Sequence, residues 1–332
     1  MGVARVPDAR LERLAQIFQP KKVTPATVEY VDLPGLAPGE GSGASANKAR
    51  DLNTYLNNLK NVDALLHVVR AFEDAAIPHV EESIDPRRDI ALFELELILS
   101  DLAIVEKRLE RLEREIKKMK SSELEAENSV LLRFKDALEK EQPLRNLELT
   151  PDERRRVKGF TFLSAKPLLV VLNLGDSDAA KIPKVAAEFN LEAPASMRAV
   201  AITAVCGKIE AEIASLSDED ARIFMEDLGL SGSGLARIIE ESYSLLGLTS
   251  FYTAGEPEVR AWTIPRHTSA QKAAGVIHTD FEKGFIKAEV VSFEDLVELG
   301  SFQAAKNKGV LRLEGKDYIV REGDVILFRF NV

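Results

Sequence analysis

Short apolar runs alternate with helical patterns through much of the chain. Residues 64–69 form a continuous apolar run, typical of a strand buried on both faces of a parallel sheet. Residues 167–172 and 199–205 predict two more strands, and residues 26–31 predict a short strand rich in β-branched and aromatic side chains. A helix is predicted at residues 51–59. Strand, helix, strand is the rhythm of an α/β fold.

Residues 86–159 interrupt this rhythm with a coiled-coil pattern. From Leu92 to Met119, apolar residues recur every three or four positions, and a second apolar stripe follows a turn at residues 120–122. We therefore expect an antiparallel helical hairpin inserted in the α/β domain. Residues 107–120 hold seven basic and three acidic residues, so this end of the hairpin is either a solvated face or an RNA contact. The RNA-binding candidates are Arg111, Arg114, Lys117 and Lys118.

The pattern changes again from residue 247 to the end of the chain. Strand-like alternation at residues 259–264, 284–291 and 317–320 surrounds a predicted helix at 295–308, and residues 324–330 predict a last strand. This is the pattern of a compact α+β module. The single tryptophan, Trp262, lies in one of these strands, and we expect it to belong to the core.

The predicted domains are therefore three. The α/β domain comprises residues 1–85 and 160–246, the hairpin comprises residues 86–159, and the C-terminal module comprises residues 247–332.

Composition narrows the class of protein. The net charge of −10 over 332 residues argues against bulk electrostatic binding to nucleic acid, and any such binding needs a local basic patch. The single cysteine, Cys206, excludes an internal disulfide and fits a reducing compartment. No apolar run reaches the roughly 18 residues of a membrane span, and the N-terminus has no signal-peptide pattern. We therefore expect a cytoplasmic protein without a membrane partner; the sequence does not indicate its oligomeric state.

Asp32 and Gly35 are the first candidates for ligand contact. An Asp at the end of a strand, three residues before a Gly, is how nucleotide hydrolases sense a terminal phosphate. The carboxylate reaches Mg²⁺ through water, and the glycine N–H meets a phosphate oxygen. A plain strand-to-turn junction also explains this short motif.

Two further strands end in polar residues, at the edge where ligands bind in open α/β sheets. Asn173, followed three residues later by Asp176, can bracket the hydrogen-bonding edge of a purine. The alternative is that these two residues cap a helix. Backbone N–H groups after the next strand can complete the base pocket, at Cys206, Gly207 and Lys208.

Longer motifs resemble the YchF family, the Obg-like ATPases related to translational GTPases. In the nucleotide domain they are Val62-Asp63-Ala64, His67-Val68-Val69-Arg70 and Lys208-Ile209-Glu210-Ala211-Glu212-Ile213. In the C-terminal module, residues 251–255, 258–263, 273–285 and 323–326, with the closing Phe330-Asn331, resemble that family's TGS domain, a ubiquitin-like β-grasp module. The resemblance implies a P-loop NTPase fold, nucleotide hydrolysis with ATP or GTP and Mg²⁺, and association with the ribosome and its rRNA.

Four departures from the family pattern affect its catalytic chemistry. The chain has no Gly-x-x-x-x-Gly-Lys-Ser/Thr loop, so we expect a start placed too late, a fragment, or a lost phosphate site. A sheet lacking a strand that should be buried favours the first two. Asn58 stands where the family carries a histidine proposed to assist hydrolysis. Asp176 stands where the family usually has Glu, which leaves the choice between ATP and GTP open. The switch segment at residues 39–47 aligns insecurely.

Two functional hypotheses follow. The first is a ribosome-associated purine-nucleotide hydrolase, with Asp32 and Gly35 at the γ-phosphate. The alternative is a ribosome- or RNA-binding adaptor that no longer hydrolyses nucleotide.

Overall fold

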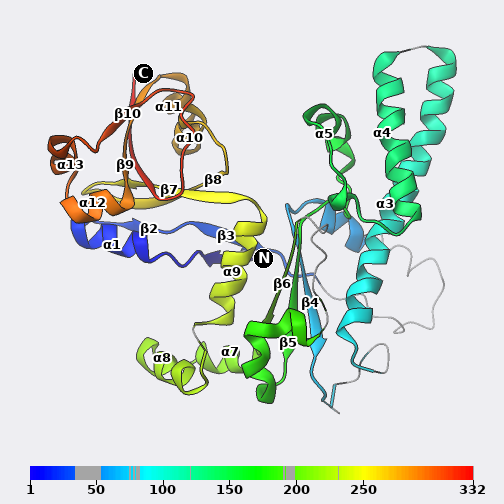
Figure 1. Cartoon of the computed structure of the whole chain (residues 1–332), viewed down its shortest axis with the longest axis horizontal. Helices are drawn as coiled ribbons and strands as arrows, with labels where there is room; N and C mark the ends of the chain where they lie inside the picture. The colour runs from blue at the N-terminus through cyan, green and yellow to red at the C-terminus, as the bar shows by residue number, and fades with distance from the viewer. Residues whose placement is uncertain are drawn as a thin grey trace. The chain divides into compact units, whose positions relative to one another are not determined.

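The computed structural model describes residues 1–33, 54–74, 76–77, 79, 83–119, 121–189, 191, 199–230 and 232–331. These residues form two compact units. One combines Met1–Asp32 with Ile239–Val332, and the other comprises Leu33–Ile238 (Figure 1).

A three-stranded parallel sheet forms the centre of the unit Leu33–Ile238. Its order is β4 (Leu65–Ala71), β5 (Leu168–Leu174) and β6 (Val200–Val205), and these are three of the predicted strands. Six of the seven residues of the central strand β5 are buried, and all six are apolar. The prediction that residues 64–69 form a strand buried on both faces is wrong for one face of β4, because Leu66 and Val68 are 36% and 60% exposed. In the described structure β4 pairs only with β5, so it is an edge strand with one buried face.

Helices surround this sheet (Figure 1). Residues 54–60 are helical, as predicted. The two long helices of the hairpin are α3 (Pro86–Lys118) and α4 (Ser122–Glu139). The other helices of this unit are short, listed in chain order: η1 (Leu144–Asn146), α5 (Pro151–Val157), η2 (Lys158–Phe160), η3 (Asp176–Lys184), α6 (Val185–Glu188), α7 (Gly207–Ile213) and α8 (Asp218–Asp227). Helix α9 (Gly234–Leu245) begins in this unit and ends in the other.

The predicted hairpin is present, with a seam that differs near its base. Val105 and Leu112 are fully buried against α4, as the coiled-coil spacing predicts. Leu92 and Leu99, which the same spacing places in the seam, are instead 43% and 54% exposed. The reason is that the first turns of α3 pack on the sheet, where Leu97 joins the core around β4 and β5, so a different face turns inward.

A buried carboxylate anchors the base of the hairpin. The side chain of Asp101, in α3, is fully buried and accepts hydrogen bonds from the backbone N–H of Leu163, at 2.9 Å, and of Ser164, at 2.7 Å. It also accepts the Ser164 hydroxyl at 2.7 Å. Leu163 and Ser164 lead into the amino end of β5. The hairpin therefore extends from the amino edge of the parallel strands, opposite the edge where the candidate base-binding residues lie.

A six-stranded sheet organises the other unit, in the order β10-β9-β11-β7-β8-β2. Its strands are β2 (Val23–Thr24), β7 (Leu248–Ala254), β8 (Val259–Pro265), β9 (Phe285–Ser292), β10 (Arg312–Glu314) and β11 (Asp324–Phe330). One face packs on α10 (Ala270–Ile277) and α11 (Thr279–Lys283), and the other on α1 (Ala9–Phe18), α12 (Phe293–Leu299) and α13 (Phe302–Lys308) (Figure 1). A central β11, parallel to β7 and antiparallel to β9, with a helix between β8 and β9, is the arrangement of a β-grasp module.

Three details of the C-terminal module differ from the sequence prediction. Residues 317–320 form an isolated bridge through Ile319 instead of a strand. Strands β7 and β10 were not predicted. The helix predicted at 295–308 is two helices, α12 and α13. The break falls at Gly300, whose φ of 73° is left-handed and closes α12, after which Ser301 caps α13 by accepting from the Ala304 N–H at 3.1 Å.

The first 32 residues pack with the C-terminal module, which corrects the predicted assignment of residues 1–85 to the nucleotide-binding domain. Strand β2 extends the six-stranded sheet by pairing with β8, and Leu11 and Leu14 of α1 are buried on that sheet. The predicted 26–31 strand exists as β3 (Thr27–Tyr30), but it pairs antiparallel with β1 (Gly2–Arg5) in a separate two-stranded sheet. The predicted boundaries of the hairpin, at residues 86 and 159, and of the C-terminal module, at residue 247, remain predictions.

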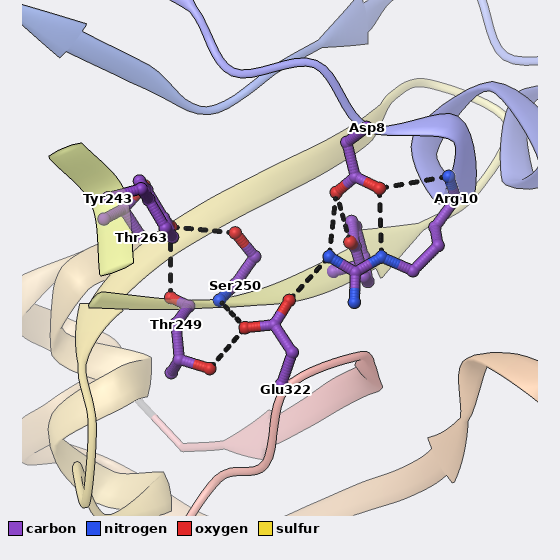
Figure 2. Close-up of polar contacts among 8 residues, drawn as sticks. Asp8, Arg10, Tyr243, Thr249, Ser250, Thr263 and Glu322 are labelled. Atoms are coloured by element: carbon purple, nitrogen blue, oxygen red, sulfur yellow. Dashed lines mark hydrogen bonds and ion pairs between the residues drawn. The ribbon is translucent and has the colours of Figure 1, made fainter. Parts of the chain in front are cut away.

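A polar network joins the N-terminal segment to the β-grasp sheet (Figure 2). The guanidinium of Arg10 donates to Asp8 at 2.9 Å and to Glu322 at 2.5 Å, and Tyr252 donates its hydroxyl to Asp8. Glu322 also accepts the backbone N–H of Ser250 at 2.8 Å. These contacts connect α1, β7 and the turn before β11, which explains why three distant segments form one unit.

Trp262 is half-buried and packs against the core beneath α10, as expected for a core residue at its margin. Its indole N–H donates to the Thr253 hydroxyl at 2.9 Å, and the Arg260 guanidinium lies 3.9 Å from the ring centroid. Both partners limit the ring's access to other groups.

Candidate nucleotide-binding site

Asn173 and Gly207 meet at the carboxyl edge of the parallel sheet. Asn173 is the sixth residue of β5, and Gly207 begins α7 directly after β6. The Gly207 N–H donates to the Asn173 Oδ1 at 2.9 Å. A side chain at Gly207 would not fit easily, since an added Cβ would lie 3.1 Å from that same oxygen. The bond fixes which end of the Asn173 amide faces Gly207, because only the oxygen can accept the N–H.

Asp176 joins the same edge from the first turn of η3. Its carboxylate accepts from the Lys208 Nζ at 2.5 Å and from the Cys206 Sγ at 3.3 Å. The hydrogen bond from Lys208, and then that from Cys206, hold the pKa of Asp176 below its usual range. Burial raises the pKa of the Cys206 thiol, so this cysteine is a neutral donor and a poor nucleophile. The five predicted base-pocket residues are thus brought together by β5, β6 and the helices that follow them.

Glu210 supports this edge from one turn further along α7. Its carboxylate accepts the Gly234 N–H at 2.7 Å and the Ser233 hydroxyl at 2.8 Å, which ties α7 to the start of α9. Arg237, one turn into α9, donates to the Ala204 carbonyl of β6 at 2.8 Å. Sequence reasoning named Glu210 only as part of a family motif, since the pattern does not show which chain atoms it meets.

The predicted phosphate-side residues are only partly described. Asp32 is exposed and ends the N-terminal segment of the other unit, two residues beyond β3. Gly35 and the switch segment 39–47 lie outside the described residues. Asn58 is exposed on the helical residues 54–60. The roles predicted for Asp32, Gly35 and Asn58 therefore stay predictions.

No group of three or more His, Cys, Asp or Glu residues that could hold a metal ion occurs within the described ranges. A single carboxylate is nevertheless the protein contribution expected for Mg²⁺ that arrives with a nucleotide, because this ion keeps several waters and phosphate oxygens. Two cavities of about 460 and 340 Å³ lie in the unit that holds the β-grasp sheet, and the base-pocket residues line neither of them.

The basic candidates of the hairpin lie near its tip, on the last three turns of α3. All four are exposed. Lys117 is paired with Glu113 at 2.6 Å, and the Nε of Arg114 donates to a backbone carbonyl one turn earlier at 3.1 Å. Arg111 and Lys118 make no ion pair with other residues in the described part of the chain. Only Lys117 is therefore in an ion pair within the described structure, and none of the four has a structural role that would prevent contact with a partner.

No helix among the described residues is long and apolar enough to cross a membrane.

Comparison with known proteins shows relatives that match along the whole of this chain. The chain is 43% identical to the protein named ribosome-binding ATPase YchF of Bacillus subtilis and 40% identical to that of Escherichia coli O157:H7; both matches cover all of this chain and 89% of the relative. The solved structure of the Schizosaccharomyces pombe YchF GTPase superposes with a TM-score of 0.84 at 31% identity, covering 98% of this chain and 86% of that one. Residues 248–331 match a family model, YchF-GTPase_C, described as a protein of unknown function (DUF933).

These matches confirm both the resemblance inferred from the motifs and the predicted architecture of an α/β nucleotide-binding fold with a helical insertion and a C-terminal module. The chain belongs to the YchF family.

Proposed function

We propose that this protein is a ribosome-associated NTPase that binds a purine nucleotide, ATP or GTP, at the carboxyl edge of β5 and β6. The observation that carries the proposal is the meeting of Asn173, Asp176 and the start of α7 at that edge. The relatives named ribosome-binding ATPase and the solved YchF GTPase support nucleotide hydrolysis and the ribosomal partner. The site of action would be the cytoplasm, where ribosomes are found.

Each polar group of the proposed pocket has a chemical task. The Asn173 amide, oriented by Gly207, donates to a purine ring nitrogen. The Asp176 carboxylate has acceptor sites left after its bonds to Lys208 and Cys206. Two N–H donors of guanine match such a carboxylate, whereas adenine offers one donor and one acceptor along the same edge. On this chemistry the pocket selects for purines and favours guanine.

Mg²⁺ would neutralise the phosphate charges when a nucleotide is bound. Asp32, which the sequence predicts to hold it through water, belongs to the other unit, so this role stays a prediction. The printed sequence has no Gly-x-x-x-x-Gly-Lys-Ser/Thr loop, so the groups proposed above would recognise the base and leave phosphate binding to other groups. Asn58, at the position where the family carries a histidine proposed to assist hydrolysis, favours the second candidate, a ribosome-binding adaptor that does not hydrolyse nucleotide.

The base pocket is tested by replacing Asp176→Asn, which exchanges one acceptor for a donor. NMR titration of wild type and variant with ATP and GTP measures dissociation constants up to the millimolar range. We expect the ratio of GTP to ATP affinity to fall about 5- to 100-fold, the discrimination of a bidentate base contact. An unchanged ratio would place the base elsewhere.

The ribosomal partner is tested by co-sedimentation across a salt series. Replacing the four tip residues by Glu (R111E/R114E/K117E/K118E) should weaken binding and reduce its salt dependence, if the tip contacts rRNA. A control with the same charge change on other exposed basic residues of the same unit is R87E/K140E/K184E/R222E. If wild type does not sediment with ribosomes at all, the proposed function is wrong.

A further inference from the structure

Helix α5 presents a second basic surface beside the hairpin. Thr150 caps it by accepting from the Glu153 N–H, and Val157 anchors it in the hairpin core. The sequence Pro151-Asp152-Glu153-Arg154-Arg155-Arg156-Val157-Lys158 follows this cap, and its four basic side chains are all exposed. The helix meets α4 through Arg133, whose Nη1 donates to the Glu153 carboxylate at 2.8 Å.

The acidic residues of α5 are already engaged. The Glu153 carboxylate accepts the Thr150 N–H at 2.7 Å and the Arg133 Nη1 at 2.8 Å. These contacts, first the backbone hydrogen bond from Thr150, lower the pKa of Glu153. Asp152 is paired with Arg155.

Three cations therefore stay uncompensated. Arg154 uses only its Nε, on the Leu149 carbonyl at 3.2 Å, which leaves its two terminal amino groups available. Arg156 and Lys158 have no hydrogen bond or ion pair with any other described residue. On a chain of net charge −10, three free cations within five residues of sequence are a local exception that attracts phosphates.

We propose that Arg154, Arg156 and Lys158, here called the α5 patch, bind the phosphate backbone of RNA at a second place, separate from the hairpin tip. The choice of RNA rests on the proposed function. Guanidinium groups suit this partner because they bind phosphate oxygens in pairs, whereas a lone lysine acts as a point charge.

The position of the patch separates it from the tip candidates. Arg133 lies eleven residues after the start of α4 at Ser122. At a rise of 1.5 Å per residue, α5 therefore meets the hairpin about 17 Å from its turn. Contacts at both places would fix the direction of an RNA along the hairpin, which neither patch alone can do.

The test is fluorescence anisotropy with a labelled RNA duplex of about 20 base pairs, longer than the roughly 16 base pairs that a double-stranded-RNA-binding domain spans. Wild type is compared with R154E/R156E/K158E and with a control of equal charge change in the same unit, R87E/K184E/R222E. The substituted side chains are exposed, and circular dichroism checks the fold. R154Q/R156Q/K158Q removes the cations without adding acids and replaces the Glu variant if that variant misfolds.

We expect the α5 variant to lose at least tenfold in affinity at about 50 mM salt, and its slope of log K against log salt to become shallower by roughly 2 to 3. The control should stay within about threefold of wild type. Equal losses in both variants would overturn the α5 patch, and so would competition by polyglutamate as effective as that by RNA, which would indicate an acidic protein partner.

Ribosome co-sedimentation of wild type separates the two proposals. If wild type sediments with ribosomes and the α5 variant binds the duplex normally, only the α5 patch is wrong. If the variant loses duplex binding while wild type does not sediment with ribosomes, the α5 patch stands and the ribosomal function is wrong.

Discussion

His67, in the middle of β4, provides a quantitative test of the packing around the parallel sheet. Its imidazole lies against Phe93, with ring centroids 4.2 Å apart, and its Nδ1 is buried without a hydrogen-bond partner in the described structure. Burial lowers the pKa of His67 from an ordinary 6.5 to about 4. The folded unit therefore keeps this side chain neutral under conditions in which the unfolded chain protonates it.

The sign of the pH effect follows from proton uptake. Between about pH 6.5 and pH 4 the unfolded state binds a proton that the folded state does not, so stability is lost as the pH falls through this window. From those two pKa values, the loss between pH 7 and pH 5 is about 2 kcal/mol. His67→Phe keeps an aromatic ring against Phe93 and cannot titrate. Its stability should fall less over the same pH interval, by about that amount.

Hydrogen exchange measured by mass spectrometry is the suitable assay, because the single tryptophan, Trp262, lies in the other unit and does not report on this sheet. Amides of β4 and β5, corrected for the intrinsic effect of pH on exchange, give the local free energy of opening. Equal losses in wild type and in His67→Phe would refute the reasoning. So would an NMR titration of His67 with a midpoint near 6.5.

Three further predictions follow, two from the contacts described above and one from the sequence. Asp101→Ala removes the acceptor of three buried donors at Leu163 and Ser164 and should destabilise the hairpin-bearing unit by about 3–5 kcal/mol, measured by urea unfolding; a loss under about 1 kcal/mol would contradict the anchoring role. Trp262→Ala should destabilise the β-grasp unit by about 2–3 kcal/mol in the same experiment, less than for a fully buried tryptophan, and a stable variant that only loses RNA binding would argue for a stacking role. The polypeptide of 332 residues as printed should bind ATP and GTP weakly and release phosphate from neither at a useful rate in a coupled assay, since most affinity for phosphates comes from a Gly-x-x-x-x-Gly-Lys-Ser/Thr loop. The proposed NTPase activity should appear only in a chain extended by the upstream codons to include that loop, and micromolar binding with turnover by the printed chain would show that the phosphate site was misplaced.

Local sequence was sufficient to predict much of the nucleotide-binding unit. The apolar runs that became β4, β5 and β6 are followed by polar residues, and parallel strands place such residues at one edge. That is why Asn173 and Asp176 could be paired with Cys206, Gly207 and Lys208 before the fold was known. The contact of Asp176 with Lys208 was not predictable, because it depends on the direction of η3 after the strand.

The placement of residues 1–32 could not be predicted, because it depends on contacts more than 200 residues apart in sequence. Strand β2 has only two residues, and its pairing with β8 is invisible in a local pattern. The ion pair of Arg10 with Glu322 belongs to the same long-range set. By contrast, the break at Gly300 was detectable, since a Gly followed by Ser is a helix end followed by a new cap.

The α5 patch was missed for a different reason. Nothing in the local pattern distinguishes its arginines from those of an ordinary solvated turn, because the sequence cannot show that Glu153 and Asp152 are occupied by other partners. Charge counting alone therefore directed attention to the hairpin tip.

The most direct test of the account is an NMR titration of the selectively labelled chain with GTP, ATP and CTP, following the Asn173 side-chain amide and the Gly207 backbone amide. The account predicts that both signals move with the purine nucleotides and stay in place with CTP, because these two groups meet the base at the carboxyl edge of β5 and β6. Purine-dependent shifts confined to other residues, with Asn173 and Gly207 unmoved, would contradict it.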